Sequence, residues 1–300
     1  MKNIEIKGVI VPLLTPMNDD ETINEKELRN QVNRQIESGI HALFPLGTNG
    51  EAYILSHEEK EQVLKIVVDE AKGRVPVYGG TGCISTKETI ELSLKAKEIG
   101  VDVLSIITPS FAAASQDELY EHYKEVAKAV DLPIVLYNIP ARTGNALAPA
   151  TVEKLSKIQN IVGVKDSSGN FDNMLQYIEK TRYRKDFAVL SGNDSLILWC
   201  LLAGGRGGIA GCANVFPSTM APIYDTFIAG NLDKAREIQD SIRSFRDCFK
   251  FGNPNTIVKT AVSLLGYPVG KCRKPFCQVP EVGIEAIKKV LEENTAKGMK

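Results

Sequence analysis

The stretch that decides the fold is Ile161-Val162-Gly163-Val164-Lys165-Asp166-Ser167-Ser168-Gly169. Its opening apolar run is typical of a strand buried on both faces. Lys165 ends the run, and a lysine is seldom buried without a partner. Because burial disfavours the charged form of an amine, a lysine here can be neutral and attack a carbonyl carbon to form a Schiff base. A lysine paired with Asp166 or another acid is the alternative, and these residues alone favour neither.

Seven further short apolar runs resemble this stretch, and longer amphipathic stretches alternate with them. Eight such units predict a (β/α)8 barrel, an α/β fold of eight parallel strands surrounded by helices. A doubly wound open sheet is the alternative, because counting strands does not prove closure. The eight predicted strands are residues 8–15, 42–46, 75–80, 101–109, 133–140, 161–165, 187–192 and 207–213.

The chain continues well beyond the last predicted barrel helix, residues 217–229. Three more helices are predicted over 231–249, 255–265 and 281–294. No linker rich in Gly, Ser or Pro precedes them. We therefore expect residues 1–229 to form the barrel, and 230–300 to form a C-terminal three-helix appendage packed on it as part of a single structural unit.

The composition restricts the class of protein. The 300 residues carry 36 Lys and Arg against 37 Asp and Glu, a net charge of −1, so no global charge favours nucleic acid or an anionic membrane. No apolar stretch is long enough to span a bilayer, and residues 1–7 lack a signal-peptide core. Six scattered cysteines and three histidines predict neither a disulfide framework nor a metal site. We expect a cytoplasmic protein.

Two more motifs follow predicted strands. Gly47-Thr48-Asn49-Gly50-Glu51 follows the second strand, and its backbone amides and polar side chains can hold a carboxylate or phosphate. Taken alone, it is more often an ordinary turn. Tyr137 ends the fifth strand and can move protons, while Arg142 can bind a carboxylate through its planar guanidinium. A structural tyrosine and a solvated arginine are at least as common.

The carboxyl ends of barrel strands meet on one face, where active sites of such barrels lie. Lys165, Tyr137 and Thr48 are therefore expected to converge there as a Schiff-base site. Tyr137 would carry the protons, and Thr48 would position it by a hydrogen bond. The small residues near Gly192 and in the glycine-rich stretch 204–211 are read as tight packing, with a phosphate cradle as the alternative.

Nearly the whole chain resembles the dihydrodipicolinate synthase / N-acetylneuraminate lyase superfamily of pyruvate-dependent class I aldolases. The resemblance rests on residues 47–51, on Tyr137-Asn138-Ile139-Pro140 and on Gly163-Val164-Lys165-Asp166. It implies a barrel assembled as a homotetramer, a Schiff base of Lys165 with pyruvate or another 2-oxo acid, and no further cofactor. It also implies the substrate-binding set, which is Gly47, Thr48, Asn49, Phe111, Arg142, Ser167, Gly192 and Ile209.

The chain departs from the synthase pattern at several places. Synthases have Thr-Thr where this chain has Thr48-Asn49, and Lys-Glu-Ala where it has 165–167, Lys-Asp-Ser. They also carry a second tyrosine that reaches into a neighbouring subunit, where this chain has Phe111. A lysine-feedback pocket matches only in part, since His57 and Glu88 are present but an amide and a tyrosine are replaced by Ile84 and Ser110. Arg142 still favours a synthase or any dicarboxylic substrate.

These departures favour a lyase that cleaves or forms the bond between pyruvate and an aldehyde, acting on a 4-hydroxy-2-oxo acid or a 2-keto-3-deoxy acid. The alternative is 4-hydroxy-tetrahydrodipicolinate synthesis from pyruvate and aspartate semialdehyde. A sugar-diacid dehydratase and a non-catalytic binder of 2-oxo acids are further alternatives. The expected partner is a small 2-oxo acid, without nucleic acid or membrane.

Overall fold

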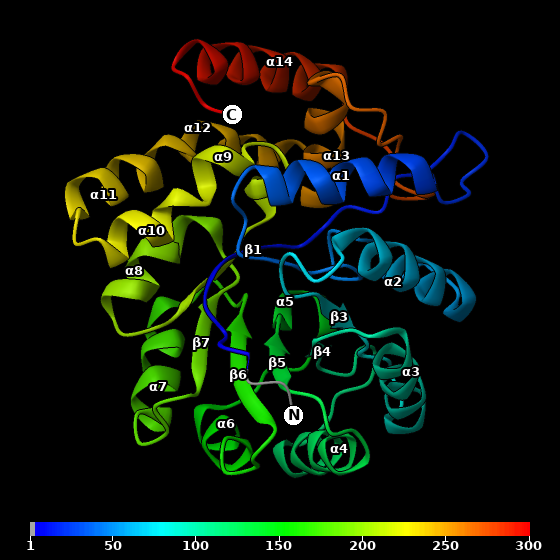
Figure 1. Ribbon diagram of the computed structural model, residues 1–300, viewed down its shortest axis with the longest axis vertical. Helices are drawn as coiled ribbons and strands as arrows, with labels where there is room; N and C mark the ends of the chain where they lie inside the picture. Colours follow the sequence, from blue (N-terminus) through cyan, green and yellow to red (C-terminus); the bar gives the residue numbers. More distant parts are fainter. Residues whose placement is uncertain (1–3) are drawn as a thin grey trace.

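The computed structural model describes residues 4–300 and has eight parallel strands in one sheet, ordered β2-β1-β8-β7-β6-β5-β4-β3 (Figure 1). The two ends of this order meet through a single bridge between Leu43 and Val77. The sheet therefore closes into the predicted (β/α)8 barrel and is not open. The strands are β1 (Gly8–Val11), β2 (Ala42–Leu43), β3 (Tyr78–Gly80), β4 (Val103–Ile107), β5 (Ile134–Asn138), β6 (Ile161–Asp166), β7 (Ala188–Ser191) and β8 (Gly207–Ile209).

Polar caps begin several of the helices that follow the strands. Ser56 and Ser115 each form a capping box, with Glu59 and Glu118 three residues on. Residues 1–3 of the stretch 1–7, which lacks a signal-peptide core, lie outside the described residues. The helices are α1 (Glu25–Glu37), α2 (His57–Ala71), α3 (Thr86–Ile99), α4 (Gln116–Ala129), α5 (Pro140–Thr143), α6 (Pro149–Leu155), α7 (Phe171–Thr181), α8 (Ile197–Leu202), α9 (Pro217–Met220) and α10 (Pro222–Ile228).

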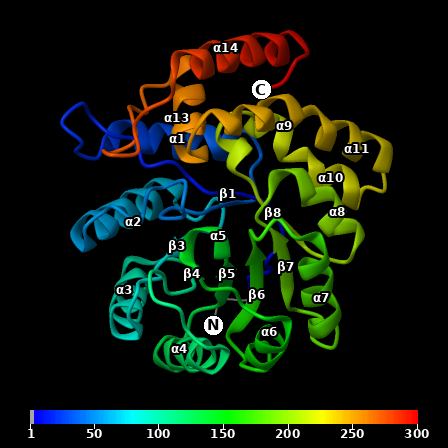
Figure 2. The same cartoon turned by 180° about the vertical axis from the view of Figure 1, so that it is seen from behind.

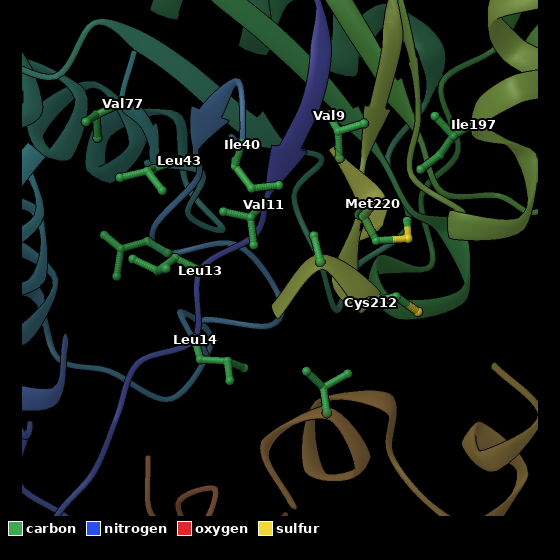
Figure 3. Packing of buried hydrophobic residues seen from close by; sticks show 14 of the residues in the cluster. Val9, Val11, Leu13, Leu14, Ile40, Leu43, Val77, Ile197, Cys212 and Met220 are labelled. Atoms are coloured by element: carbon green, nitrogen blue, oxygen red, sulfur yellow. The ribbon is translucent and has the colours of Figure 1, made fainter. Parts of the chain in front are cut away.

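The strands are mostly apolar because both of their faces are buried. In β1, Val9 and Val11 pack in the layer between sheet and helices, whereas Ile10 points into the barrel. Figure 3 shows Val9 and Val11 in that outer layer together with Leu43 and Met220. Each such side chain stabilises the fold by roughly 1.5–3 kcal/mol on burial. The predicted continuous apolar runs are thus explained by two cores on either side of one sheet.

The C-terminal residues form a group of helices on one side of the barrel, beside α1 and α9 (Figures 1 and 2). The helix predicted over 231–249 is interrupted after Ser241, whose hydroxyl donates to the Ile238 carbonyl at 2.7 Å and competes with helix continuation. The division of the chain at 229/230 stays a prediction. The elements are α11 (Leu232–Ser241), α12 (Arg243–Arg246), a 3-10 turn (Asp247–Phe251), α13 (Pro254–Leu264) and α14 (Glu281–Ala296). Within residues 4–300, no helix has the length and apolar character needed to cross a bilayer.

Candidate active site

Lys165 and Tyr137 are direct neighbours on adjacent strands. Tyr137 in β5 pairs with Lys165 in β6. The Lys165 Nζ lies 3.8 Å from the centre of the Tyr137 ring and 5.2 Å from that of Phe44, which is itself packed edge-on against Tyr137. Only 4% of Lys165 is exposed. The amine is therefore enclosed by aromatic faces inside the barrel, where a carbonyl carbon reaching it would be shielded from water.

Asp166 does not neutralise this lysine by pairing with it. Its carboxylate accepts hydrogen bonds from Asn138 Nδ2 at 2.9 Å, from the Ser168 amide and hydroxyl at 3.0 Å each, and from Asn173 Nδ2 at 3.0 Å. Over the described residues 4–300, Lys165 makes no ion pair. The alternative in which Lys165 pairs with Asp166 or another acid is thus not the one that the fold adopts. Asp166 instead fixes the end of β6.

Thr48 reaches Tyr137 as the sequence predicted. The hydroxyl oxygens of Thr48 and Tyr137 lie 3.0 Å apart. Burial raises the pKa of Tyr137, but the charge of Lys165 and hydrogen bonds from Thr48, Lys165 and Ser167 outweigh burial, so the pKa lies below that of an ordinary phenol. A lowered pKa makes the phenolate of Tyr137 easier to form. The phenolate can accept a proton and the phenol can return it, which suits a proton carrier beside a nucleophilic amine.

The other predicted residues lie around this trio at different depths. The Asn49 amide lies beside Gly211, where an added Cβ would be 3.4 Å from the Asn49 nitrogen. A Cβ on Gly192 would meet the Ser167 hydroxyl at 1.9 Å, so Gly192 makes the space that Ser167 occupies. Ile209 is buried in the barrel interior with Tyr137. Gly47 packs against Phe44, and its absence of a side chain leaves room for that ring.

A cavity of about 470 Å³ opens above Tyr137 and Thr48. Arg142 lines its outer part, where the guanidinium donates to the Asn253 Oδ1 at 3.3 Å. The buried hydroxyl of Ser105 also lines it and has no hydrogen-bond partner in the described part of the chain. The volume suits a small organic acid together with a second small substrate.

Phe111 does not join this site in the single chain. Its side chain is 99% exposed, and it is absent from the lining of the cavity. Its backbone has φ of 79°, a left-handed conformation that is unfavourable for a bulky residue. Asn145 holds the segment by donating to the carbonyls of Pro109 and Ala112. The single chain therefore does not place Phe111 in the substrate-binding set that the sequence predicted.

The residues matched to a feedback pocket lie on the flank of the same cavity. His57 begins α2, Glu88 lies in the first turn of α3, and Ile84 and Ser110 lie in the loops after β3 and β4. Lys60 lines this flank as well. The structure thus brings the four together, although the amide and the tyrosine of the synthase pattern are replaced.

The C-terminal helices contribute residues that sequence reasoning missed. Asn255 Nδ2 donates to the Thr48 carbonyl at 2.6 Å, and Lys259 Nζ donates to Glu51 Oε1 at 2.6 Å. No pattern in the sequence links residues that are more than 200 positions apart. The one local signal is Asn253-Pro254, an N-cap followed by a helix-starting proline, which places Asn255 in the first turn of α13.

A closed (β/α)8 barrel with a buried lysine beside a tyrosine of lowered pKa at its strand ends defines a Schiff-base lyase class of enzyme. Residues 5–294 match the model of the dihydrodipicolinate synthetase family. The chain belongs to this family, whose members are pyruvate-dependent class I aldolases and lyases.

Relatives of known name and structure agree. The chain is 41% identical over 292 residues to a 4-hydroxy-tetrahydrodipicolinate synthase of Methanopyrus kandleri, covering 96% of each chain. It matches the structure of dihydrodipicolinate synthase from Thermotoga maritima with a TM-score of 0.94 and 31% identity, over 97% of this chain and 99% of the other. It also matches YagE, a prophage protein of the same family from E. coli K12 in complex with pyruvate, with a TM-score of 0.93, 29% identity and coverage of 97% and 99%.

These names correct the emphasis of the sequence interpretation. The departures at Asn49, Phe111 and Ser167 favoured an aldolase of 4-hydroxy-2-oxo acids. The comparisons do not support that interpretation and agree better with the alternative, a synthase. Three residues of a site are weaker evidence for the substrate than similarity along almost the entire chain. The reaction depends on the whole cavity, to which many parts of the chain contribute.

Proposed function

We propose that the enzyme forms a Schiff base between Lys165 and pyruvate and condenses the product with aspartate semialdehyde to give 4-hydroxy-tetrahydrodipicolinate. The observation that carries the first half is the enclosure of the Lys165 amine against Tyr137, whose hydroxyl meets that of Thr48. The second half is supported by the relatives' names and by Arg142, a cation at the outer part of the cavity.

The chemistry follows from this placement. Lys165 gives up a proton and its amine attacks the 2-oxo carbon, and loss of water from the carbinolamine leaves an iminium ion. The iminium withdraws electrons, so a proton leaves the methyl carbon and an enamine forms. Enamine attack on the aldehyde makes the new C–C bond. The second substrate's amine then displaces Lys165 and closes the ring.

The proton transfers that form the Schiff base have a candidate carrier on the chain. Tyr137 takes the proton that the amine loses and returns it to the carbinolamine hydroxyl as water leaves. Thr48 orients the Tyr137 hydroxyl. Asn49 and the backbone amides of the loop at Gly47 are proposed to hold the pyruvate carboxylate. The proposed sequence draws its electron sink from the iminium itself and calls for no cofactor.

One trapping experiment tests the first half. Incubation with pyruvate and borohydride should add a reduced pyruvyl group to intact protein, and peptide mapping should place it on Lys165. An adduct on another residue, or none in folded protein, would remove the proposal. Tight binding of 2-oxo acids without an adduct would favour a non-catalytic binder.

A substrate comparison tests the second half. We expect turnover of pyruvate with aspartate semialdehyde to exceed cleavage of 4-hydroxy-2-oxoglutarate or 2-keto-3-deoxy sugar acids by at least 100-fold in kcat/KM. The aldolase remains the second candidate, because Phe111 cannot relay a proton as tyrosine does. The reverse ratio would favour it. Water loss without pyruvate release from a sugar diacid would favour the dehydratase.

We also propose that the chain works as a homo-oligomer, a tetramer by family resemblance, in which Phe111 is buried against another copy. Support comes from the fully exposed Phe111 side chain, held in left-handed backbone by Asn145. Sedimentation velocity should give the mass of four chains. Phe111→Asp should lower that mass, whereas Tyr183→Asp, at an exposed aromatic in the loop after α7, should not. A cytoplasmic location stays a prediction.

A further inference from the structure

The loop after β2 contains two residues in unfavourable backbone conformations. Leu46 has φ of 60° and Glu51 has φ of 57°, so two non-glycine residues in left-handed backbone flank Thr48 and Asn49. Such conformations persist only where surrounding structure over-determines them, and they gather at functional sites. The contacts that hold this loop therefore decide where the Thr48 hydroxyl lies.

One face of α13 supplies two of these contacts. Asn255 and Lys259 are four residues apart and so project from the same side of the helix. Asn255 Nδ2 donates to the Thr48 carbonyl at 2.6 Å and to the Tyr53 hydroxyl at 3.3 Å. Only 2% of Asn255 is exposed. The hydrogen bond therefore forms without competition from water and fixes the backbone of the residue that touches Tyr137.

The second contact is a buried ion pair. Lys259 Nζ lies 2.6 Å from Glu51 Oε1, and both side chains are 1% exposed. The remaining groups are satisfied, since Glu51 Oε2 accepts from the Arg273 amide at 2.8 Å and Lys259 Nζ donates to the Lys271 carbonyl at 3.0 Å. The cost of desolvating both charges makes such a pair weak evidence for stability. Its geometry is more informative, because it fixes one position of the loop relative to α13.

We propose that Asn255, supported by the Glu51–Lys259 pair, is a positioning residue that sets the distance between the Thr48 and Tyr137 hydroxyls. The inference rests on the proposed function, because it concerns the same site. Asn255 bonds Thr48 and Tyr53 rather than Tyr137 or Lys165, and it acts on Tyr137 through Thr48. The C-terminal helices thus contribute to the reaction by holding a loop of the barrel.

The chemical consequence is specific. Thr48 stabilises the Tyr137 phenolate through its hydrogen bond. If the loop relaxes by a fraction of an ångström, that bond lengthens and the phenolate loses support, so the pKa of Tyr137 rises. A purely structural role for Asn255 predicts lower stability with unchanged titration of Tyr137.

The test is the titration of Tyr137 followed by NMR of protein labelled at the tyrosine Cζ, with the signal assigned by its loss in Tyr137→Phe. We expect Asn255→Ala to move the Tyr137 midpoint to higher pH and to lower kcat roughly 10- to 100-fold, as misplacement of about 1 Å does. Asn255→Leu keeps the bulk, lacks the donor and should behave alike if the alanine variant does not fold. Asn294→Ala, a buried asparagine of α14 that bonds Ser244, is the matched control and should leave the midpoint unchanged.

The titration needs no turnover, so its result is independent of the substrate. A folded Asn255 variant whose Tyr137 midpoint equals that of the parent overturns the positioning role. Equal shifts in the Asn255 and Asn294 variants overturn it too, because they indicate general loosening. Failure of the parent protein to trap pyruvate would instead overturn the proposed function and leave the titration result standing.

Discussion

The hydroxyl oxygens of Thr48 and Tyr137 lie 3.0 Å apart, although 89 positions separate the two residues along the chain. Thr48 follows β2 and Tyr137 lies in β5, so only the closed barrel brings them together. The contact links the loop proposed to hold the substrate carboxylate to the group proposed to carry protons. It also makes the acidity of Tyr137 depend on a residue that can be changed without touching the tyrosine.

Thr48→Val should shift the pH dependence of the reaction. The variant keeps the shape of threonine and removes one hydrogen bond to the phenolate, so the pKa of Tyr137 rises from its lowered position. At a fixed pH less phenolate is present, and the acid limb of the kcat profile therefore moves to higher pH. We expect about a tenfold loss of kcat at neutral pH. Thr48→Ser, which keeps the hydroxyl, should retain the parent profile; a Val variant with that profile contradicts the link.

Lys165→Met should abolish turnover and the borohydride-trapped adduct, because methionine fills the same space without an amine. Loss of a covalent nucleophile costs at least about 10³-fold in kcat. Intact-mass measurement after trapping checks the adduct. Lys259→Met removes another buried lysine and serves as the comparison, since any folded fraction of it should still be labelled.

Tyr137→Phe should leave the fold intact and slow both Schiff-base formation and turnover. Proton transfer by a positioned side chain contributes about 10²- to 10⁴-fold, so the loss should fall in that range. Rapid trapping with pyruvate measures the first step directly. Tyr183→Phe, whose hydroxyl contacts Ser156 away from the cavity, should match the parent. Unchanged trapping in Tyr137→Phe would assign proton transfer to another group.

Arg142→Leu should separate the two substrates. The guanidinium lies at the outer part of the cavity, away from the Lys165 amine, so pyruvate trapping should be unchanged. We expect KM for aspartate semialdehyde to rise at least tenfold, because a charge-assisted hydrogen bond contributes about 1.5–3 kcal/mol. Arg206→Leu, at an exposed arginine before β8, is the control. Equal KM values would place the second carboxylate elsewhere.

The buried pair between Glu51 and Lys259 makes a prediction about stability. Lys259→Met leaves a carboxylate buried without its cation and should lower the free energy of unfolding by about 3–5 kcal/mol. The double variant Glu51→Gln/Lys259→Met should recover part of this loss, since no charge remains. Urea denaturation measures both. Lys288→Met at the exposed Lys288–Glu285 pair should change stability by less than about 1 kcal/mol. A double variant no more stable than the single one contradicts the account.

The barrel and the meeting of Lys165 with Tyr137 follow from local pattern. Continuous apolar runs report strands buried on both faces, and the ends of parallel strands gather on one side. Residues placed directly after such strands must therefore lie close together, whatever their distance along the chain. The roles proposed for them stay predictions until they are measured.

Other features had no local signal. The break after Ser241 depends on a side-chain bond within a stretch whose apolar spacing continues. The reach of Asn255 to Thr48 depends on how α13 packs, which is a property of the whole fold. The exposure of Phe111 depends on the conformation of the loop after β4, which the local sequence does not specify. The second substrate likewise depends on the full cavity. The interpretation from sequence gave too much weight to Asn49, Phe111 and Ser167.

The tether of α13 to the β2 loop also orders events during synthesis. Asn255 is made 90 residues after Lys165, which at about 5–20 residues per second is a delay of about 5–18 s. During that interval the strands that carry Lys165 and Tyr137 have left the ribosome while the loop lacks its anchor. A nascent chain is thus expected to hold the nucleophile before it can use it, so that reactivity toward cellular 2-oxo acids begins only when translation is nearly complete.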